Sequence, residues 1–174
     1  AATGDTQQGI GRQGARVAFC DIDAAASEAL VARLSTVCKT APRYGACDVR
    51  DTGAYQAHLA QVEADLGAIR VLVNNAGNDA RHTLAELTPE YWDNCLALNL
   101  KHHVFAIQQV APGMASAGGG SIINLGSISW MRGRANLVGY TTAKAGISGL
   151  SRTLARELGE GNIRVNALVP GAIV

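Results

Sequence analysis

Short apolar segments that run into small or polar residues alternate along this chain with longer segments of helical character. The clearest of these apolar segments lie within residues 72–77, 121–127 and 165–171. Alternation of strands and helices is typical of a parallel sheet, because each crossover brings the chain back to the same edge. The sequence therefore predicts an α/β fold with its ligand site at the carboxyl ends of the strands.

Helical segments are predicted between these strands. Thr88-Pro89-Glu90 is a strong helix start, with a capping hydroxyl, a proline at the first position and an acid in the first turn. Gly118-Gly119-Gly120 ends the same connection. The predicted helices are 24–34, 52–66, 88–114 and 140–158, and two further strands are predicted at 15–20 and 44–47.

Composition fits one domain over residues 1–174. The hydrophobic content of 48% is enough to bury a core, and no repeat or low-complexity run divides the chain. A net charge of +1 with interspersed signs argues against nucleic-acid binding, and no apolar run is long enough to cross a membrane.

No metal site is expected from the cysteines and histidines. The cysteines fall in no metal-like pairs, and we expect them to be small buried apolar residues of a protein in a reducing compartment, the cytoplasm. The histidines lack ligand spacing as well, and we expect them at the surface. These residues are Cys20, Cys38, Cys47 and Cys95, and His58, His82, His102 and His103.

Tyr140 and Lys144 are one helical turn apart, with Ser127 thirteen residues before the tyrosine. Positions four apart project from one face of a helix, so the phenol and the ammonium can converge. A fixed cation favours the phenolate, so Lys144 would lower the pKa of Tyr140 toward a useful range for proton transfer. The alternative is an ordinary half-exposed pair on a helix.

Two further segments supply context. Asn74-Asn75-Ala76-Gly77 ends one predicted strand with amides and a glycine, which lets a flat cofactor approach the backbone, although both asparagines could simply cap a turn. Pro170-Gly171 ends another strand in a turn. Asn99, taken alone, could be a polar residue within a helix.

Together these motifs resemble the short-chain dehydrogenase/reductase family, in matching order over nearly the whole chain. The resemblance implies a Rossmann-like doubly wound sheet with helices on both faces, a nicotinamide cofactor, and hydride transfer between a cofactor and an alcohol or carbonyl. The residues that carry it are Asn74-Asn75-Ala76-Gly77, Asn99, Ser127, Tyr140, Lys144 and Pro170-Gly171.

The resemblance also implies residue roles. Ser127 would hydrogen-bond the substrate oxygen, and Tyr140 would be the acid or base. Lys144 would also bind the nicotinamide ribose, and Asn99 would hold the water that passes protons to solvent. The residues expected to contact the cofactor are Gly4, Gly9, Ile10, Gly11, Asp21, Asp48, Val49, Asn75, Ala76, Gly77, Tyr140, Lys144, Pro170, Gly171 and Ile173.

The amino-terminal part departs from the family pattern. Four residues separate Gly4 from Gly9 where the family's glycine-rich phosphate turn has three, and only three residues lie between Gly11 and the next strand. A parallel crossover needs a dozen or more residues. We therefore expect a piece of a longer enzyme that lacks the family's first strand, the following helix and the carboxyl-terminal segment.

Asp21 follows the predicted strand at 17–20, where an acidic side chain can accept hydrogen bonds from both adenosine ribose hydroxyls. Its charge would repel a 2′-phosphate, so NAD is expected rather than NADP. Asp21 or Asp23 could instead cap the next helix. Asp48-Val49 resembles the family's adenine-contacting dipeptide, or is another helix cap.

A substrate class is suggested by Ser127-Ile128-Ser129-Trp130-Met131, which is similar to sugar 1-dehydrogenases of the family. An indole there could stack on the apolar face of an aldose that is oxidised to its lactone, or could pack beneath a substrate lid. The alternatives are a reductase of 3-oxoacyl thioesters, another secondary alcohol dehydrogenase, or an inactive or partner-binding remnant. The resemblance implies a homodimer or homotetramer formed through the helices at 88–114 and 140–158.

Overall fold

The computed structural model describes residues 9 and 11–171, and these form two compact units that divide between Leu66 and Gly67. In the first unit, strand β1 (Ala18–Asp21) pairs in parallel with strand β2 (Arg43–Ala46). Helix α2 (Ala24–Ser35) connects the two strands, and helix α3 (Thr52–Leu66) follows β2. This is a βαβ unit followed by a helix, as the sequence predicts.

The segment before β1 is short. Gly14 donates a backbone hydrogen bond to the Gly11 carbonyl at 3.0 Å and has a positive φ of 94°, which closes a turn. Over residues 11–17 the structure has no strand and no helix of crossover length. The crossover helix that the family pattern places before this strand is therefore missing from residues 11–17 of the fold, as the sequence predicts.

The second unit contains a parallel sheet in the order β3-β4-β5. Leu72 is paired with Ile122, and Ile122 with Val165, so apolar residues align across the sheet. The elements are β3 (Val71–Asn74), η1 (Leu84–Glu86), α4 (Pro89–Leu96), η2 (Ala97–Lys101), α5 (His102–Ser116), β4 (Gly120–Leu125), α6 (Val138–Glu157), η3 (Gly159–Gly161) and β5 (Ile163–Leu168).

One continuous parallel sheet was the expectation, and the described strands form two sheets instead. In a doubly wound order the family's first strand lies at the centre and pairs with a neighbour on either side. No strand precedes β1 within residues 9 and 11–17, so nothing described there supplies those hydrogen bonds. The five described strands are otherwise parallel within their sheets, as predicted.

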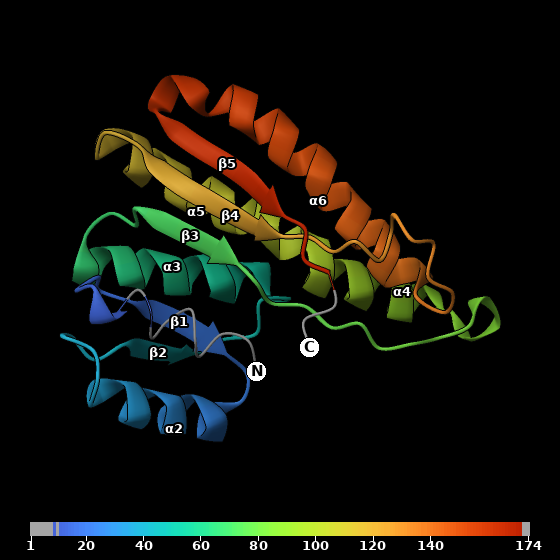
Figure 1. Ribbon diagram of the computed structural model, residues 1–174, viewed down its shortest axis with the longest axis horizontal. Helices are drawn as coiled ribbons and strands as arrows, with labels where there is room; N and C mark the ends of the chain where they lie inside the picture. The colour runs from blue at the N-terminus through green and yellow to red at the C-terminus, as the bar shows by residue number, and fades with distance from the viewer. Residues whose placement is uncertain (1–8, 10, 172–174) are drawn as a thin grey trace. The chain divides into compact units, whose positions relative to one another are not determined.

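Helices α5 and α6 cover the second sheet. Helix α5 packs on β3, β4 and β5, and α6 packs on β4 and β5. The completely buried side chains include Met114 of α5, Ile122 of β4 and Ile147 of α6. In Figure 1 the three strands point the same way, and the loops after β3 and β4 extend beyond their carboxyl ends.

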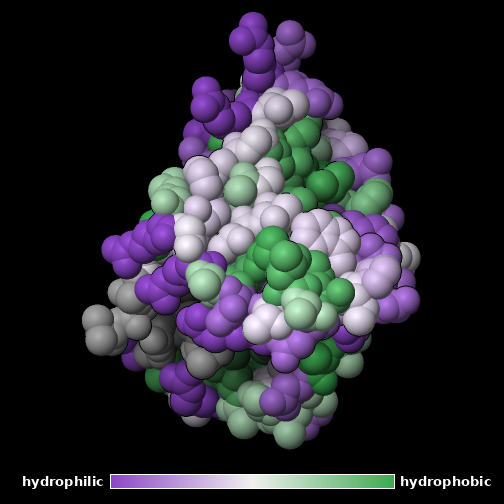
Figure 2. Space-filling model, turned by 90° about the vertical axis from the view of Figure 1, so that its right-hand side faces the viewer, coloured by the Kyte–Doolittle hydropathy of each residue, from purple (hydrophilic) through white to green (hydrophobic). Residues whose placement is uncertain are grey.

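That end of the second unit carries exposed apolar side chains. Leu84 is 78% exposed and Met131 is 58% exposed, and they belong to the segments that follow β3 and β4. Figure 2 faces the side toward which the strands point, and hydrophobic side chains gather near its middle.

The predicted helix at 88–114 is interrupted by a π turn, η2. Thr88 caps α4 by accepting a hydrogen bond from the Tyr91 N–H at 3.2 Å, as the sequence predicts. Farther along, the Asn99 side chain donates to the Cys95 carbonyl at 3.0 Å, an acceptor that the regular α-helical ladder would use for the Asn99 N–H. The extra residue in this turn therefore occurs where the Asn99 side chain competes with the backbone for the Cys95 carbonyl. Such π turns are frequent at functional sites.

Candidate active site

The carboxyl ends of β4 and β5 are joined by backbone hydrogen bonds. Gly126 N–H donates to the Leu168 carbonyl at 2.8 Å, and Ile128 N–H donates to the Pro170 carbonyl at 3.3 Å. Ser127, between these donors, therefore lies beside the Pro170 turn, as the parallel arrangement predicts.

Ser127 is buried and held by one neighbour. It is 8% exposed, its Oγ accepts a hydrogen bond from the Ser129 N–H at 3.1 Å, and its hydroxyl donates to Ser129 Oγ at 2.8 Å. The backbone contact fixes the position of the oxygen, while the hydroxyl proton can turn to another acceptor.

Tyr140 and Lys144 project from the same face of α6, as their spacing predicts. The ammonium lies 5.6 Å from the centroid of the tyrosine ring. Lys144 is only 3% exposed, and its ammonium donates to the Leu125 carbonyl at 2.7 Å. Burial lowers the pKa of Lys144 to about 8, because the charged form loses hydration.

Asn99 is brought to the loop after β3. Its Oδ1 accepts a hydrogen bond from the Asn78 N–H at 2.9 Å, and the residue is 1% exposed. A Cβ placed on Gly77 would lie 2.9 Å from this oxygen and 3.4 Å from the Lys144 ammonium. The absence of a side chain at Gly77 therefore allows the loop, the amide and the cation to meet.

The two asparagines after β3 have different environments. Asn74 is 1% exposed and donates to Asn124 Oδ1 at 2.9 Å, and Asn124 donates to Ser151 Oγ at 3.0 Å. This buried chain of amides ties β3, β4 and α6 together. Asn75 is exposed, so of the two it is the one whose side chain is open to a ligand.

The expectation of surface histidines is wrong for three of the four. His82, His102 and His103 are 6%, 2% and 0% exposed, and His58 is half-buried. His102 Nε2 lies 3.3 Å from the Ala76 carbonyl oxygen, in the same loop that Asn99 contacts. Burial lowers the pKa of His102 to about 4, so the ring is neutral near pH 7.

His102 is therefore a functional candidate that the sequence reasoning missed. A signal was present, because the buried positions of α5 include 102, 103, 106, 107 and 110, the spacing of one helix face. Tracing that apolar face back to its first turn places both histidines in the interior.

Among the predicted site residues of the first unit, Asp21, Asp48 and Val49 lie at or just after the carboxyl ends of its strands. Asp21 is the last residue of β1, is exposed, and accepts a hydrogen bond from the Asp23 N–H at 3.0 Å. Asp23 caps α2 by accepting from the Ala26 N–H at 3.0 Å, so of the two acids it is the one that caps. Gly11 is buried, and a Cβ there would lie 2.6 Å from Cys38 Sγ.

Asp48 does not cap the following helix. Its carboxylate binds Arg50, with a shortest contact of 2.6 Å, and this guanidinium lowers the pKa of the carboxyl group. Asp51 makes the contact expected of a cap, accepting from the Ala54 N–H at 3.0 Å. Val49 is buried, so a ligand would meet its backbone rather than its side chain.

The remaining predictions concern residues near the two ends of the chain, the cysteines, metal sites and membrane spans. Gly4, Ile10 and Ile173 lie outside the described residues, whereas Gly9 and Gly171 are described and exposed. The cysteines are free thiols but half-buried rather than buried. Within the described ranges, no group of cysteine, histidine and acidic side chains could hold a metal ion. Nor is any described helix long and apolar enough to cross a membrane.

The residues of the second unit fit the nicotinamide end of a dinucleotide. Lys144 is a buried cation with three N–H donors, one of which binds the Leu125 carbonyl. A buried charge needs further partners, and ribose hydroxyls would be suitable acceptors. The bare Gly77 backbone next to this cation leaves room for a close approach.

Solved structures share this architecture. A metagenomic short-chain oxidoreductase in complex with NADP has a TM-score of 0.91 and 31% sequence identity, over 97% of this chain and 76% of that one. The fold is thus a Rossmann-like doubly wound α/β arrangement. The short chain dehydrogenase family model matches residues 5–174, and the chain belongs to that family.

Curated relatives include enzymes of sugars and polyols. The chain is 51% identical to a D-xylose 1-dehydrogenase of Caulobacter vibrioides over 95% of its own length. It is 38% identical to a D-threitol dehydrogenase of Mycolicibacterium smegmatis over 93% of its length. It spans 64% and 62% of the lengths of these two relatives.

Proposed function

We propose that this protein is an NAD-dependent dehydrogenase that oxidises a secondary alcohol, with an aldose as the substrate and its lactone as the product. The observation that carries the proposal is the buried Lys144 ammonium, 5.6 Å from the Tyr140 ring centroid and hydrogen-bonded to the end of the strand that leads to Ser127. Such a cation next to a phenol suits proton transfer at a hydroxyl group.

Each residue has a distinct role in this proposal. Tyr140 takes the hydroxyl proton of the alcohol, and the nearby Lys144 charge stabilises the phenolate that accepts this proton. Ser127 donates its O–H to the substrate oxygen, since its Oγ is already positioned by the Ser129 N–H. Asn99 holds the loop at Asn78 and would also hold the water that passes protons to solvent. When bound, the nicotinamide would take the hydride from the substrate carbon.

NAD rather than NADP is proposed because of Asp21. Its carboxylate is exposed at the end of β1, and Asp23, not Asp21, caps α2. An exposed carboxylate can accept hydrogen bonds from two ribose hydroxyls and would repel a 2′-phosphate.

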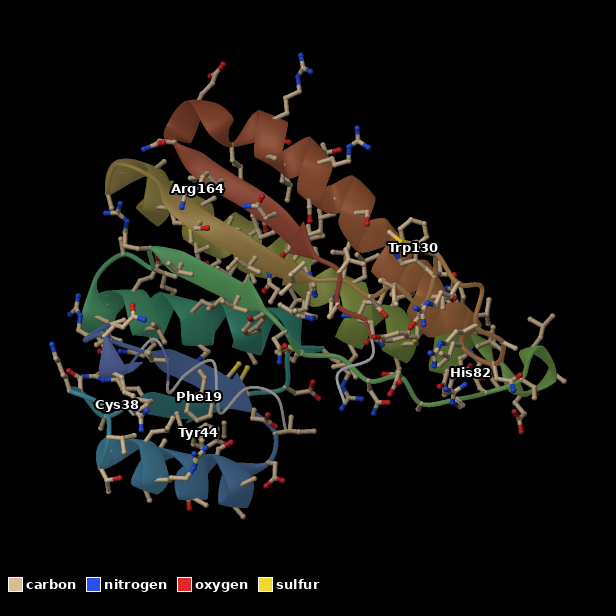
Figure 3. The ribbon with its side chains drawn as sticks, in the orientation of Figure 1. Phe19, Cys38, Tyr44, His82, Trp130 and Arg164 are labelled. Carbon is tan, nitrogen blue, oxygen red and sulfur yellow. The ribbon has the colours of Figure 1, made fainter. Side chains whose placement is uncertain are left out.

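An aldose is proposed because of the relatives and the segment after β4. One relative is named for D-xylose and another for D-threitol. Trp130 is half-buried three residues after Ser127, and its Nε1 has no hydrogen-bond partner within the described residues. Figure 3 shows Trp130 on the segment between β4 and α6. An indole face suits the apolar side of a sugar ring.

Turnover tests this function. Purified protein is mixed with NAD and D-xylose, other aldoses or simple secondary alcohols, and NADH formation is followed by absorbance. We expect turnover with an aldose, its loss in Tyr140→Phe with NADH binding retained, and a much smaller change in the control Tyr91→Phe, which loses only a hydrogen bond to the Ala80 carbonyl. Retained turnover in Tyr140→Phe would remove this tyrosine from the acid/base role.

Two other outcomes would overturn parts of the proposal. Oxidation of NADH with acetoacetyl-CoA, without activity on any aldose, would indicate a 3-oxoacyl thioester reductase. Binding of NAD should stabilise the folded protein by about 2.7 kcal/mol when its concentration is a hundredfold above Kd. No thermal stabilisation by NAD would indicate a remnant that does not bind the cofactor.

Assembly and location complete the proposal. We place the protein in the cytoplasm as a homodimer or homotetramer, formed through α4, α5 and α6. Val104 of α5 and Val138 of α6 are 38% and 39% exposed, which is consistent with a partner on these helices. The four free thiols suit a reducing compartment. Sedimentation velocity tests the assembly, and a monomer at micromolar concentration would contradict it.

A further inference from the structure

The loop after β3 is held by two side chains from the same helical stretch. Asn99 Oδ1 accepts from the Asn78 N–H at 2.9 Å, and His102 Nε2 lies 3.3 Å from the Ala76 carbonyl oxygen. These contacts fall on either side of Gly77. Residues 75–83 have no regular secondary structure, so their position depends on contacts with other segments.

The spacing of the two side chains explains how they reach one loop. Asn99 and His102 are three residues apart, which places them on the same face of a helix. Asn99 lies in the π turn η2, and His102 is the first residue of α5. Both contacts therefore come from the junction between the π turn and α5.

The chemistry of the His102 contact follows from its partner. A carbonyl oxygen can only accept, so the ring nitrogen facing Ala76 carries the proton. Burial keeps the pKa of His102 low although the Ala76 and Leu98 carbonyls favour the charged ring, and the nearby Lys144 charge lowers it further. His102 is therefore a neutral donor, compatible with a buried ammonium in its surroundings.

We propose that His102 is a positioning residue for the cofactor loop at 75–78, holding the Ala76 peptide so that Asn75 and Gly77 are presented to the nicotinamide end of a pyridine dinucleotide. The proposal rests on the function proposed above. His102 is then a second tether on the loop, in addition to Asn99. This role is separate from those proposed for the catalytic residues.

Two measurements on the purified full chain test the tether. Hydrogen exchange, followed by mass spectrometry of peptides that contain residues 75–78, reports on the loop without any cofactor. Titration of NADH, followed by its fluorescence, reports on binding. The variants are His102→Ala, His102→Gln, whose amide N–H can replace the Nε2 donor, and the matched control His103→Gln.

We expect His102→Ala to speed exchange of the loop amides and to weaken NADH binding, each roughly three- to tenfold, the loss of one hydrogen bond. His102→Gln should restore both toward the wild-type values. His103→Gln changes the neighbouring buried ring, whose centroid lies 4.3 Å from that of His102, but keeps the His102 contact with Ala76, so both readouts should change less than in His102→Ala.

Each contrary outcome is distinguishable. Unchanged loop exchange in His102→Ala, or an equal increase in His103→Gln, would overturn the tether. Faster exchange with wild-type NADH affinity would overturn its link to the cofactor. If the wild-type protein binds no NADH at all, the proposed function fails, and the exchange result alone then decides whether His102 orders the loop.

Discussion

Lys144 of α6 donates a hydrogen bond to the carbonyl of Leu125, the last residue of β4, at 2.7 Å. This contact joins the helix that carries Tyr140 to the strand that leads to Ser127. A buried ammonium is costly in water-free surroundings, and the low pKa of Lys144, about 8, expresses that cost. The site therefore holds a lysine whose charged form is destabilised by burial.

The first prediction concerns alkaline pH and the variant Lys144→Met. The ordinary pKa of 10.5 applies to the unfolded chain and about 8 to the folded one, so between these values the unfolded state holds the extra proton. The stability of the wild type should therefore rise with pH across this window relative to the variant, by about 3 kcal/mol in total. Below pH 8 the difference should be flat.

Urea unfolding of both proteins between pH 7 and 10 measures this difference. Parallel curves for wild type and Lys144→Met would show that the lysine has an ordinary pKa in the folded protein. The variant should also be inactive, because the cation is needed for turnover even though its burial costs stability.

The second prediction concerns Gly77→Ala. The new methyl group would lie 2.9 Å from Asn99 Oδ1, an oxygen held by the Asn78 N–H. Relief requires the loop to move, so we expect a loss of about 1–3 kcal/mol in unfolding free energy and weaker NADH binding. Gly149→Ala is the control, because nothing lies within 4 Å of its Cβ position in α6 and it should stabilise the helix by about 0.5–1 kcal/mol. A neutral result for Gly77→Ala would mean that the loop adapts freely.

The third prediction concerns acid stability. Burial lowers the pKa of His102 to about 4 and that of His103 to about 2, from an ordinary value of 6.5. Below pH 6.5 the unfolded chain takes up protons that the folded chain refuses, so stability falls on acidification by up to about 1.4 kcal/mol per pH unit for each ring. His103→Gln should remove one ring's share of this slope.

Denaturant unfolding at pH 7, 6, 5 and 4.5 compares the two slopes. If His103→Gln loses stability with acid as steeply as the wild type, the His103 ring is not a source of the acid sensitivity.

The fourth prediction concerns cofactor choice and Asp21→Ser. Removal of the exposed carboxylate removes the repulsion of a 2′-phosphate, so NADP binding should improve relative to NAD by about tenfold or more. Asp23→Ser is the matched control. It also removes one negative charge, but from the residue that caps α2, and serine can replace aspartate as the cap. The ratio of dissociation constants for the two cofactors is the measurement, and an unchanged ratio in Asp21→Ser would assign cofactor choice to other residues.

Local patterns predicted most elements of this fold. The helix expected at 52–66 is observed as α3 over Thr52–Leu66, and Thr88 caps α4 as its sequence indicates. The four-residue spacing of Tyr140 and Lys144 placed them on one helix face, which the 5.6 Å contact confirms. Such features depend on neighbours within one or two turns, so the sequence alone carries them.

Other features required contacts between distant segments. The π turn at Ala97–Lys101 depends on which way the Asn99 amide points, and apolar periodicity does not show this. The histidines were misplaced because their polarity was read without the buried face that they share with α5. The pairing of the strands into two sheets depends on hydrogen bonds between segments that are distant in the sequence.

The sequence by itself determined the element types, the shared face of Tyr140 and Lys144, and membership of the short chain dehydrogenase family. Only the tertiary structure decided that Lys144 meets Leu125, that Asn99 meets Asn78, and that His102 meets Ala76. These partners lie 19, 21 and 26 residues apart. Their contacts exist because parallel crossovers return each loop to the same edge of the sheet, where burial leaves polar groups only one another as partners.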